Sequence, residues 1–365
     1  MLKVGIVGLP NVGKSSLFNA LTAAGAPSEN YPFCTVEPNV GTVEVPDPRL
    51  ALIHSKTGSL KKVPTVMQFV DIAGLVEGAS EGEGLGNQFL GNIRETDAIA
   101  HVLRCFDDPD ITHVLGSVDP VRDKEIVETE LILCDLETVE RRLEKVLKKA
   151  KSGEKDAIQE AAVLEKAQAA LSEGKPVRQI EVDDEELKTL KGFQLLTAKP
   201  VLFVANVAES DLPEGENAWV AALRGKVEEE GAGRVVTICS AIESELSELE
   251  PAEKVEFLGE LGLEESGLDR LIREGYTLLG LITFFTTGEK ESRAWTVRQG
   301  ATGPNAAGAI HSDFERGFIR AETLAYDDFI ETGGWKEAKD KGVLRSEGKE
   351  YVVKDADIML FRFNV

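Results

Sequence analysis

The sequence predicts an α/β fold, in which a mostly parallel sheet with helices on both faces is interrupted by a helical hairpin and followed by a small, mostly β domain. Three observations lead to this prediction. Short apolar runs alternate with helical stretches along the N-terminal and middle parts of the chain, which is typical of parallel sheets. This alternation stops over a long heptad-patterned stretch and then resumes. From about residue 279, short β-like runs between glycines and polar turns replace it.

Five apolar runs predict the strands of the α/β domain. The first is Lys3–Val7, and a helix is expected after it at residues 16–24. The other four runs are residues 67–70, 97–106, 200–205 and 235–239. Because strands of the same kind resume at residue 200, we assign residues 1–122 and 199–278 to two parts of one domain.

The stretch between those two parts has a helical pattern. Apolar residues spaced alternately four and three apart form an a/d seam, made of Ile132, Leu136, Val139, Leu143, Val146 and Ala150. Residues 151–154 break the seam, and a second helical stretch is expected at residues 156–172. Two helices with a short break form an antiparallel hairpin. We therefore expect an inserted hairpin at residues 123–198 and a separate C-terminal domain at residues 279–365.

The composition excludes several classes of protein. The chain carries 64 acidic and 41 basic side chains, a net charge of −23, so we expect no specific DNA binding and RNA contact only through a local basic patch. Its four cysteines lack zinc spacing, which favours free thiols in a reducing compartment. No apolar run reaches the ~18–20 residues that span a bilayer, and the first residues lack the pattern of a signal peptide. We therefore expect a cytoplasmic protein without membrane contact.

Residues 8–15 fit the phosphate-binding pattern G-x-x-x-x-G-K-[ST], the P-loop, at every position. The pattern follows a predicted strand and opens a predicted helix, so backbone N–H groups and the helix N-terminus can face phosphate oxygens. Lys14 is expected to reach the β- and γ-phosphates as a catalytic residue, and the Ser15 hydroxyl to bind Mg²⁺. The nucleotide-binding residues expected here are Asn11, Val12, Gly13, Lys14, Ser15 and Ser16.

Three further residues are expected around the phosphates. Asp71 directly follows the predicted strand at 67–70, where such sites place a carboxylate that binds Mg²⁺ through water. The N–H group of Gly74 can donate to the γ-phosphate, so we count Gly74 among the catalytic candidates. Thr35 lies between the P-loop helix and that strand, where a switch threonine completes the Mg²⁺ coordination. A threonine without this role is an equal alternative at this point.

The choice of base depends on residues 206–209, Asn-Val-Ala-Glu, which stand where GTP-binding domains carry N-K-x-D. The aspartate of that pattern accepts hydrogen bonds from guanine, and adenine lacks the 2-amino group. A displaced carboxylate removes the main basis for choosing guanine, and losing one paired polar contact can shift specificity by orders of magnitude. We therefore expect ATP rather than GTP as the preferred substrate. The residues expected around the base are Asn206, Val207, Glu209, Ser240 and Ala241.

Positioning of the attacking water is the least defined part of the site. A glutamine usually follows the D-x-x-G pattern and orients this water, whereas Leu75 stands here, so we expect slow intrinsic hydrolysis. Three candidates could help: His113 as a catalytic residue, Asn11 together with a K⁺ ion, or a residue of a partner. An ordinary loop histidine is the alternative for His113.

Taken together, these motifs resemble the YchF subfamily of the Obg-like ATPases, a group of P-loop proteins that carry a TGS domain. The resemblance covers nearly the whole chain. It depends on residues 8–15, 32–39, 71–76, 82–87 and 206–209, and on the run Ala-Gly-Ala-Ile-His-Ser-Asp-Phe-Glu at 307–315.

The resemblance implies an OBG-type G domain with an inserted hairpin and a C-terminal β-grasp (TGS) domain. It also implies ATP preference, Mg²⁺ held by Ser15 and Thr35, and association with the ribosome in translation or stress control. The large subunit or its RNA could be contacted through the TGS domain and the basic first hairpin helix, with a solvated, internally paired helix face as the alternative. The basic residues of that helix are Arg141, Arg142, Lys145, Lys148, Lys149 and Lys151.

Three functions therefore stay open from the sequence. The first is a slow regulatory ATPase on the ribosome, the second a GTP-dependent switch of the Obg type, and the third a nucleotide-gated binding module with incidental hydrolysis. We expect a monomer, because the heptad seam can be satisfied within the hairpin.

Overall fold

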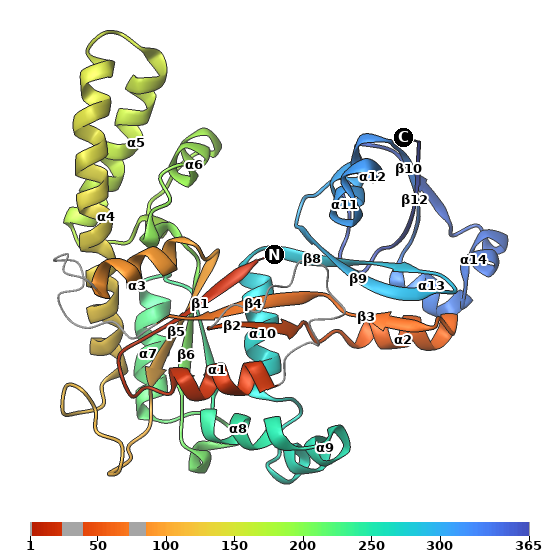
Figure 1. The fold of residues 1–365 in the computed structure, drawn as a ribbon, viewed down its shortest axis with the longest axis horizontal. Helices are drawn as coiled ribbons and strands as arrows, with labels where there is room; N and C mark the ends of the chain where they lie inside the picture. Colours follow the sequence, from red (N-terminus) through yellow and green to blue (C-terminus); the bar gives the residue numbers. More distant parts are fainter. Residues whose placement is uncertain (1, 24–38, 73–84, 365) are drawn as a thin grey trace. The chain divides into compact units, whose positions relative to one another are not determined.

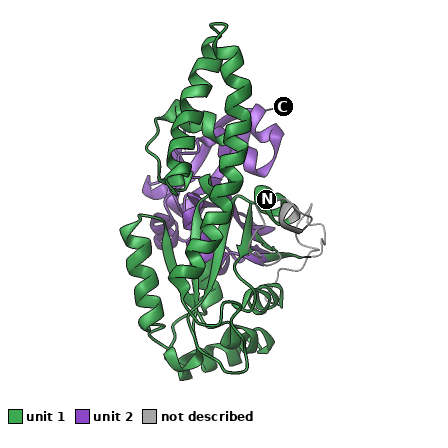
Figure 2. Cartoon of the chain, turned by 90° about the vertical axis from the view of Figure 1, so that its left-hand side faces the viewer, with its two compact units in different colours: residues 1–25, 36–42, 68–271 green, residues 26–35, 43–67, 272–365 purple. Residues whose placement is uncertain are grey.

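The computed structural model describes residues 2–23, 39–72 and 85–364 of the chain. The chain divides into two compact units (Figure 2). Unit 1 comprises residues 1–25, 36–42 and 68–271, and unit 2 comprises residues 26–35, 43–67 and 272–365. In the described part of the chain, no helix combines the length and apolarity that a bilayer crossing needs.

A six-stranded sheet forms the centre of unit 1 (Figure 1), in the order β2-β4-β1-β5-β6-β7. Its strands are β1 (Lys3–Val7), β2 (Val40–Glu44), β4 (Val66–Asp71), β5 (Ala98–Arg104), β6 (Val201–Asn206) and β7 (Arg234–Ile238). The pairs β4–β1, β1–β5, β5–β6 and β6–β7 are all parallel. The predicted α/β class is therefore confirmed, and each of the five predicted strands exists with bounds shifted by at most two residues. Because parallel strands end at the same edge, the loops that follow them meet there.

Helices pack around this sheet. The predicted helix after the first strand is α1 (Lys14–Ala23), which packs against α8 (Ser240–Glu248). Besides the hairpin helices, unit 1 has α3 (Leu85–Arg94), α6 (Asp184–Lys191), α7 (Ala218–Glu229) and α9 (Pro251–Glu260). The next helix, α10 (Gly267–Leu278), is divided between the two units at residue 271. Short 3₁₀ turns lie at Val177–Gln179, Leu196–Ala198 and Glu209–Asp211.

The hairpin consists of α4 (Pro120–Ala150) and α5 (Lys155–Ser172), which pack along each other. The a/d seam predicted from the sequence lies in their shared core, where Val139, Leu143 and Val146 are buried against Ala161 and Leu164. The break predicted at residues 151–154 separates the two helices as expected. The first helix begins three residues before the predicted boundary at 123, because Asp119 caps it by accepting the N–H of Arg122 and Pro120 occupies its first turn.

A buried ion-pair network fixes the base of α4. The Lys124 side chain is fully buried, and its Nζ donates to Glu128 Oε2 at 2.8 Å and to Glu230 at the end of α7. Arg178 pairs with the same Glu128. Charges buried this deeply tolerate little displacement, because breaking one such pair leaves an uncompensated charge.

Unit 2 contains a second six-stranded sheet, in the order β11-β10-β12-β8-β9-β3. Its strands are β3 (Lys61–Val63), β8 (Leu281–Thr287), β9 (Glu291–Arg298), β10 (Phe318–Leu324), β11 (Arg345–Glu347) and β12 (Ile358–Phe363). The predicted runs at 282–286, 294–297, 317–320 and 358–361 fall in four of these strands. The run at 351–353 forms only an isolated bridge between Thr302 and Val352.

The expectation of a mostly β C-terminal domain underestimated its helices. Four short helices lie between its strands: α11 (Gly303–Ile310), α12 (Ser312–Arg316), α13 (Tyr326–Thr332) and α14 (Trp335–Lys341). None exceeds eight residues, which is too short for a helical period to stand out from the sequence. Their apolar residues nevertheless contribute to the core, as Phe329 and Ala338 do.

Residues 43–67 belong to unit 2, whereas the predicted boundaries placed all of residues 1–122 in the first domain. The reason lies in the pairing of β3 with β9 and in the packing of α2 (Pro48–Thr57), whose Leu50 and Ile53 are buried in the core of unit 2. Arg49 strengthens this attachment, because its Nη1 lies 2.6 Å from Asp355 Oδ2.

Candidate nucleotide-binding site

The carboxyl ends of β1, β5, β6 and β7 meet around a cavity of about 540 Å³ in unit 1. The P-loop contributes one part of the lining, and the loops after β5, β6 and β7 contribute the rest. The lining residues are Asn11, Gly13, Lys14, Ser15, Ser16, Phe106, Asp107, Asp108, Ile111, Asn206, Val207, Ala208, Glu209, Cys239, Ser240, Ala241 and Ser244. The expected nucleotide-binding residues of the P-loop and the base side therefore line one cavity, except Val12, which is buried.

The P-loop backbone requires glycine at two places. Gly8 has φ +154°, and a Cβ there would lie 2.4 Å from the carbonyl oxygen of Val102 on β5. Gly13 has φ +101°, and its Cβ would lie 2.2 Å from Asn206 Nδ2. No side chain fits either contact. The P-loop is thus packed tightly against β5 and β6, and α1 begins directly after it with its N-terminus at the cavity.

Lys14 is the charged group of the P-loop. Its Nζ donates to the backbone carbonyl of Leu9 at 2.6 Å, and only 8% of the residue is exposed. Burial lowers the pKa of Lys14 to about 8, and the nearby Asp71 carboxylate acts in the opposite direction. Burial also raises the pKa of Asp71, against the influence of Lys14. A phosphate in the cavity would compensate the buried ammonium charge and favour its protonated form.

The oxygen atoms expected to bind Mg²⁺ are partly within the described residues. Ser15 is exposed and lines the cavity, and Asp71 is half-buried at the end of β4. Hydroxyl and carboxylate oxygens fit Mg²⁺, which often keeps few protein ligands and takes others from substrate phosphates and water. Consistent with that, residues 2–23, 39–72 and 85–364 contain no group of three or more His, Cys, Asp or Glu that could hold a metal. Thr35 and Gly74 lie outside the described residues, as does Leu75.

Asn206 connects three loops of the site through its side-chain amide. Its Nδ2 donates to the carbonyl of Val12 at 2.9 Å, and its Oδ1 accepts the backbone N–H of Ser240 at 3.0 Å. The residue is 1% exposed. Its amide therefore holds the P-loop and the start of α8 in place, in addition to lining the cavity.

The other base-side residues surround this anchor. Val207 is buried, and its N–H donates to the carbonyl of Ile238 at 2.9 Å. Glu209 is exposed and begins a 3₁₀ turn at the cavity. Ser240 and Ala241 form the first turn of α8.

The loop between β5 and α4 was missed by the sequence analysis. Phe106, Asp107, Asp108 and Ile111 line the cavity, although no motif marks them. Topology could have found them, because they follow a strand that pairs with β1 and parallel strands carry their ligand-binding loops at the carboxyl edge.

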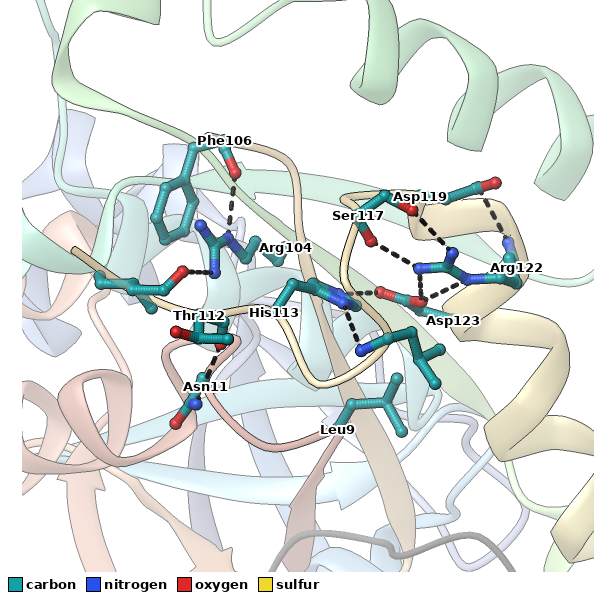
Figure 3. Close-up of polar contacts among 12 residues, drawn as sticks. Leu9, Asn11, Arg104, Phe106, Thr112, His113, Ser117, Asp119, Arg122 and Asp123 are labelled. Carbon is teal, nitrogen blue, oxygen red and sulfur yellow. Dashed lines mark hydrogen bonds and ion pairs between the residues drawn. The ribbon is translucent and has the colours of Figure 1, made fainter. Parts of the chain in front are cut away.

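His113 is not available as a free base in this arrangement. Its Nδ1 accepts the backbone N–H of Leu115 at 3.1 Å, and its Nε2 lies 2.8 Å from Asp123 Oδ2. The ring is therefore a neutral imidazole that donates from Nε2, and both nitrogens are used (Figure 3). His113 is buried and is not part of the cavity lining. These contacts contradict the expectation that it positions water, and favour the alternative that it fixes the loop to α4.

Two protein families match the chain. The family described as a 50S ribosome-binding GTPase matches residues 3–134, and a C-terminal family of YchF GTPases, described as a protein of unknown function, matches residues 281–364. Curated relatives match over the full length. The ribosome-binding ATPases YchF of Haemophilus ducreyi and Bacillus subtilis are each 56% identical, covering 100% of this chain and 99% and 100% of the relatives. Obg-like ATPase 1 of Caenorhabditis elegans is 43% identical, covering 100% of this chain and 92% of the relative.

A solved structure supports the same similarity. The structure of the Schizosaccharomyces pombe YchF GTPase superposes with a TM-score of 0.89 at 38% identity, covering 99% of this chain and 97% of that one. These relatives are named after different nucleotides, since the bacterial ones are called ATPases and the yeast one a GTPase.

Proposed function

Because this chain belongs to the YchF family of P-loop proteins, we propose that it is a cytoplasmic Mg²⁺-dependent ATPase that binds the ribosome and acts there as a slow regulatory switch. The observation that carries this proposal is that the P-loop and residues 206–209 line the same cavity. A phosphate site is thereby joined to a base site that lacks the N-K-x-D residues. The bacterial relatives are named ribosome-binding ATPases, which supports both parts of the proposal.

The phosphate end of the site would work through the P-loop. Lys14 would leave the Leu9 carbonyl and bind the β- and γ-phosphate oxygens, while backbone N–H groups and the N-terminus of α1 would hold the remaining phosphate charge. Mg²⁺, when bound, would neutralise charge that develops on the phosphates during transfer. Ser15 would supply a direct oxygen ligand and Asp71 a carboxylate that acts through water. Thr35 and Gly74 remain proposed as the further metal ligand and γ-phosphate donor.

The residues that line the base side support the proposed preference for ATP. A guanine-selective site needs a carboxylate that accepts from N1–H and the 2-amino group of the base. Glu209 lies on an exposed turn, and Val207 offers a buried apolar side chain where N-K-x-D proteins have lysine. We propose that the base lies among Asn206, Val207, Glu209, Ser240 and Ala241, with the loop after β5 as a further part of the lining.

Because both ring nitrogens of His113 are engaged, another group must position the attacking water. Asn11 has φ +61° in the P-loop, and its Nδ2 donates to the carbonyl of Thr112 at 3.1 Å. Its amide oxygen is left to take part in K⁺ binding next to the phosphates, and a partner residue is the other source of activation. Either route agrees with slow turnover by the isolated chain.

The hairpin offers a contact surface for ribosomal RNA. Three of its six basic residues are paired with carboxylates, Arg141 with Glu137, Arg142 with Glu160 and Lys148 with Glu144. Within the described residues, Lys145, Lys149 and Lys151 have no carboxylate at ion-pair distance. RNA phosphates recognise such unpaired cations in a salt-dependent way. The C-terminal domain, net −2 over residues 280–365, is a second candidate contact with the large subunit, and a monomer is the proposed form.

The first experiment is equilibrium binding of fluorescent ATP and GTP analogues with Mg²⁺, competed by the unlabelled nucleotides. ATP binding at least about tenfold tighter than GTP, a difference of about 1.4 kcal/mol, supports the proposal. GTP binding tighter by the same margin would replace it with a GTP-dependent switch of the Obg type. Turnover that ribosomes do not stimulate would favour the third function, a nucleotide-gated binding module.

A further inference from the structure

Arg104, the last residue of β5, is a buried guanidinium that the nucleotide chemistry described above does not use. It is 1% exposed. Its Nε donates to the carbonyl of Phe106 at 3.1 Å, its Nη1 to that of Ile111 at 2.8 Å and its Nη2 to that of Asp108 at 3.3 Å. Among the described residues, no carboxylate lies within ion-pair distance of this guanidinium, so its hydrogen bonds go to backbone carbonyls of one loop.

The three acceptors share a second property. Phe106, Asp108 and Ile111 all line the nucleotide cavity. Arg104 therefore holds, through their backbone carbonyls, three residues that line the cavity. Its guanidinium carbon also lies 4.6 Å from the centre of the Phe106 ring, so the cation covers one side of that ring (Figure 3).

The remaining anchors of this loop lie on both sides of the segment. Before it, Asn217 Nδ2 donates to the carbonyl of Cys105 at 2.8 Å and to Asp211 Oδ2 at 2.9 Å, which connects the start of the segment to the turn Glu209–Asp211 on the base side. Asn11 of the P-loop donates to the Thr112 carbonyl, and His113 is bound to Asp123 on α4. These contacts hold residues 105, 112 and 113, on either side of segment 106–111. Without the guanidinium, three carbonyls of the segment would lose their charged donor. The hydrogen bonds that Asp108 accepts from the backbone N–H groups of Asp110 and Ile111, at 2.8 and 3.2 Å, would remain.

We propose that Arg104 is a positioning residue that fixes segment 106–111 as the base-side wall of the cavity and thereby sets the affinity for the nucleoside part of the nucleotide. This inference rests on the proposed nucleotide site. The phosphate end is formed by different residues, namely Lys14 and the N-terminus of α1, whereas the hydrogen bonds of the guanidinium go to Phe106, Asp108 and Ile111. Loss of Arg104 should therefore weaken recognition of the base and sugar and leave phosphate binding intact.

The test separates these two parts of the ligand. Arg104→Met removes every donor and keeps the length of the side chain. We expect the Kd of Mg-ATP to rise at least tenfold and the Kd of inorganic tripolyphosphate with Mg²⁺ to stay within twofold, both measured by competition with a fluorescent ATP analogue. Arg178→Met is the matched control, because the Arg178 side chain in unit 1 is only 11% exposed but lies outside the cavity lining. Its ratio of the two Kd values should equal that of the unaltered chain.

Equal losses for both ligands in Arg104→Met, or an unchanged Kd for ATP, would overturn the proposal. If thermal unfolding shows that this variant does not fold, Arg104→Lys serves instead. It keeps the charge with a single donor group and should shift the same ratio in the same direction by a smaller factor, whereas an unshifted ratio would overturn the proposal. An unaltered chain that binds neither ATP nor tripolyphosphate would refute the nucleotide site itself, which is a different result.

Discussion

Raising the pH from 7 to 9 is expected to weaken nucleotide binding about tenfold through Lys14. Burial sets the pKa of this ammonium at about 8 in the free protein. It is then mostly protonated at pH 7 and only about one-tenth protonated at pH 9. Bound phosphates raise its pKa, so above pH 8 binding must take up a proton, and affinity falls as pH rises. The expected loss is about 1.4 kcal/mol.

The assay is a competition titration of Mg-ATP at pH 7, 8 and 9 at constant ionic strength. Phosphate groups, with a second pKa of about 6, are already ionised across this range, so the ligand contributes little to the change. Lys14→Arg is the control, since a guanidinium stays charged throughout and should remove the pH dependence even where it weakens binding. A Kd for the unaltered chain that stays within twofold between pH 7 and 9 would refute the reasoning. A pH dependence retained in Lys14→Arg would assign it to another group.

Three further outcomes are expected. Asn206→Ala should lower the free energy of unfolding by at least about 2 kcal/mol in urea titrations, because it leaves the buried Val12 carbonyl and Ser240 N–H without partners; an unchanged midpoint would contradict the anchoring role. ATP turnover should be faster in K⁺ than in Na⁺ buffer, and equal rates would remove K⁺ from the proposed site. Reversing the charge of the hairpin lysines that lack an ion pair should reduce ribosome co-sedimentation, increasingly so at low salt. An equal reduction when the charges of three lysines elsewhere are reversed would show that only net charge matters. The test set is Lys145, Lys149 and Lys151, and the control set is Lys175, Lys188 and Lys191.

The parts of the protein that could be predicted are formed by residues that are close together in the sequence. The P-loop is one continuous segment in which local backbone geometry requires the glycines. Gly13, with φ +101°, has a backbone conformation that other residues rarely adopt. The hairpin was predictable for a similar reason, since a heptad seam repeats over many turns and its partner helix follows at once.

The parts that could not be predicted depend on contacts between distant segments. Arg104 lies at the end of an apolar run, where nothing in the sequence distinguishes a strand-end arginine in solvent from one buried under a loop. His113 was a plausible base by residue type, and only the positions of Leu115 and Asp123 exclude it. The assignment of residues 43–67 depended on a three-residue strand, β3, which is too short for its pairing to be predicted.

The buried network around Lys124 has a mechanical consequence. From Lys124 to Ala150, α4 extends for about 39 Å at the usual rise per residue. Because ion pairs connect the start of this helix to Glu230 after α7 and to Arg178, the hairpin must follow any rotation of the elements that carry these residues as a stiff rod. A tilt of about 5° at the foot would carry the tip through about 3 Å, comparable to the length of a hydrogen bond. A movement too small to open the nucleotide cavity would thus be enough to make or break a hydrogen bond at the tip of the hairpin.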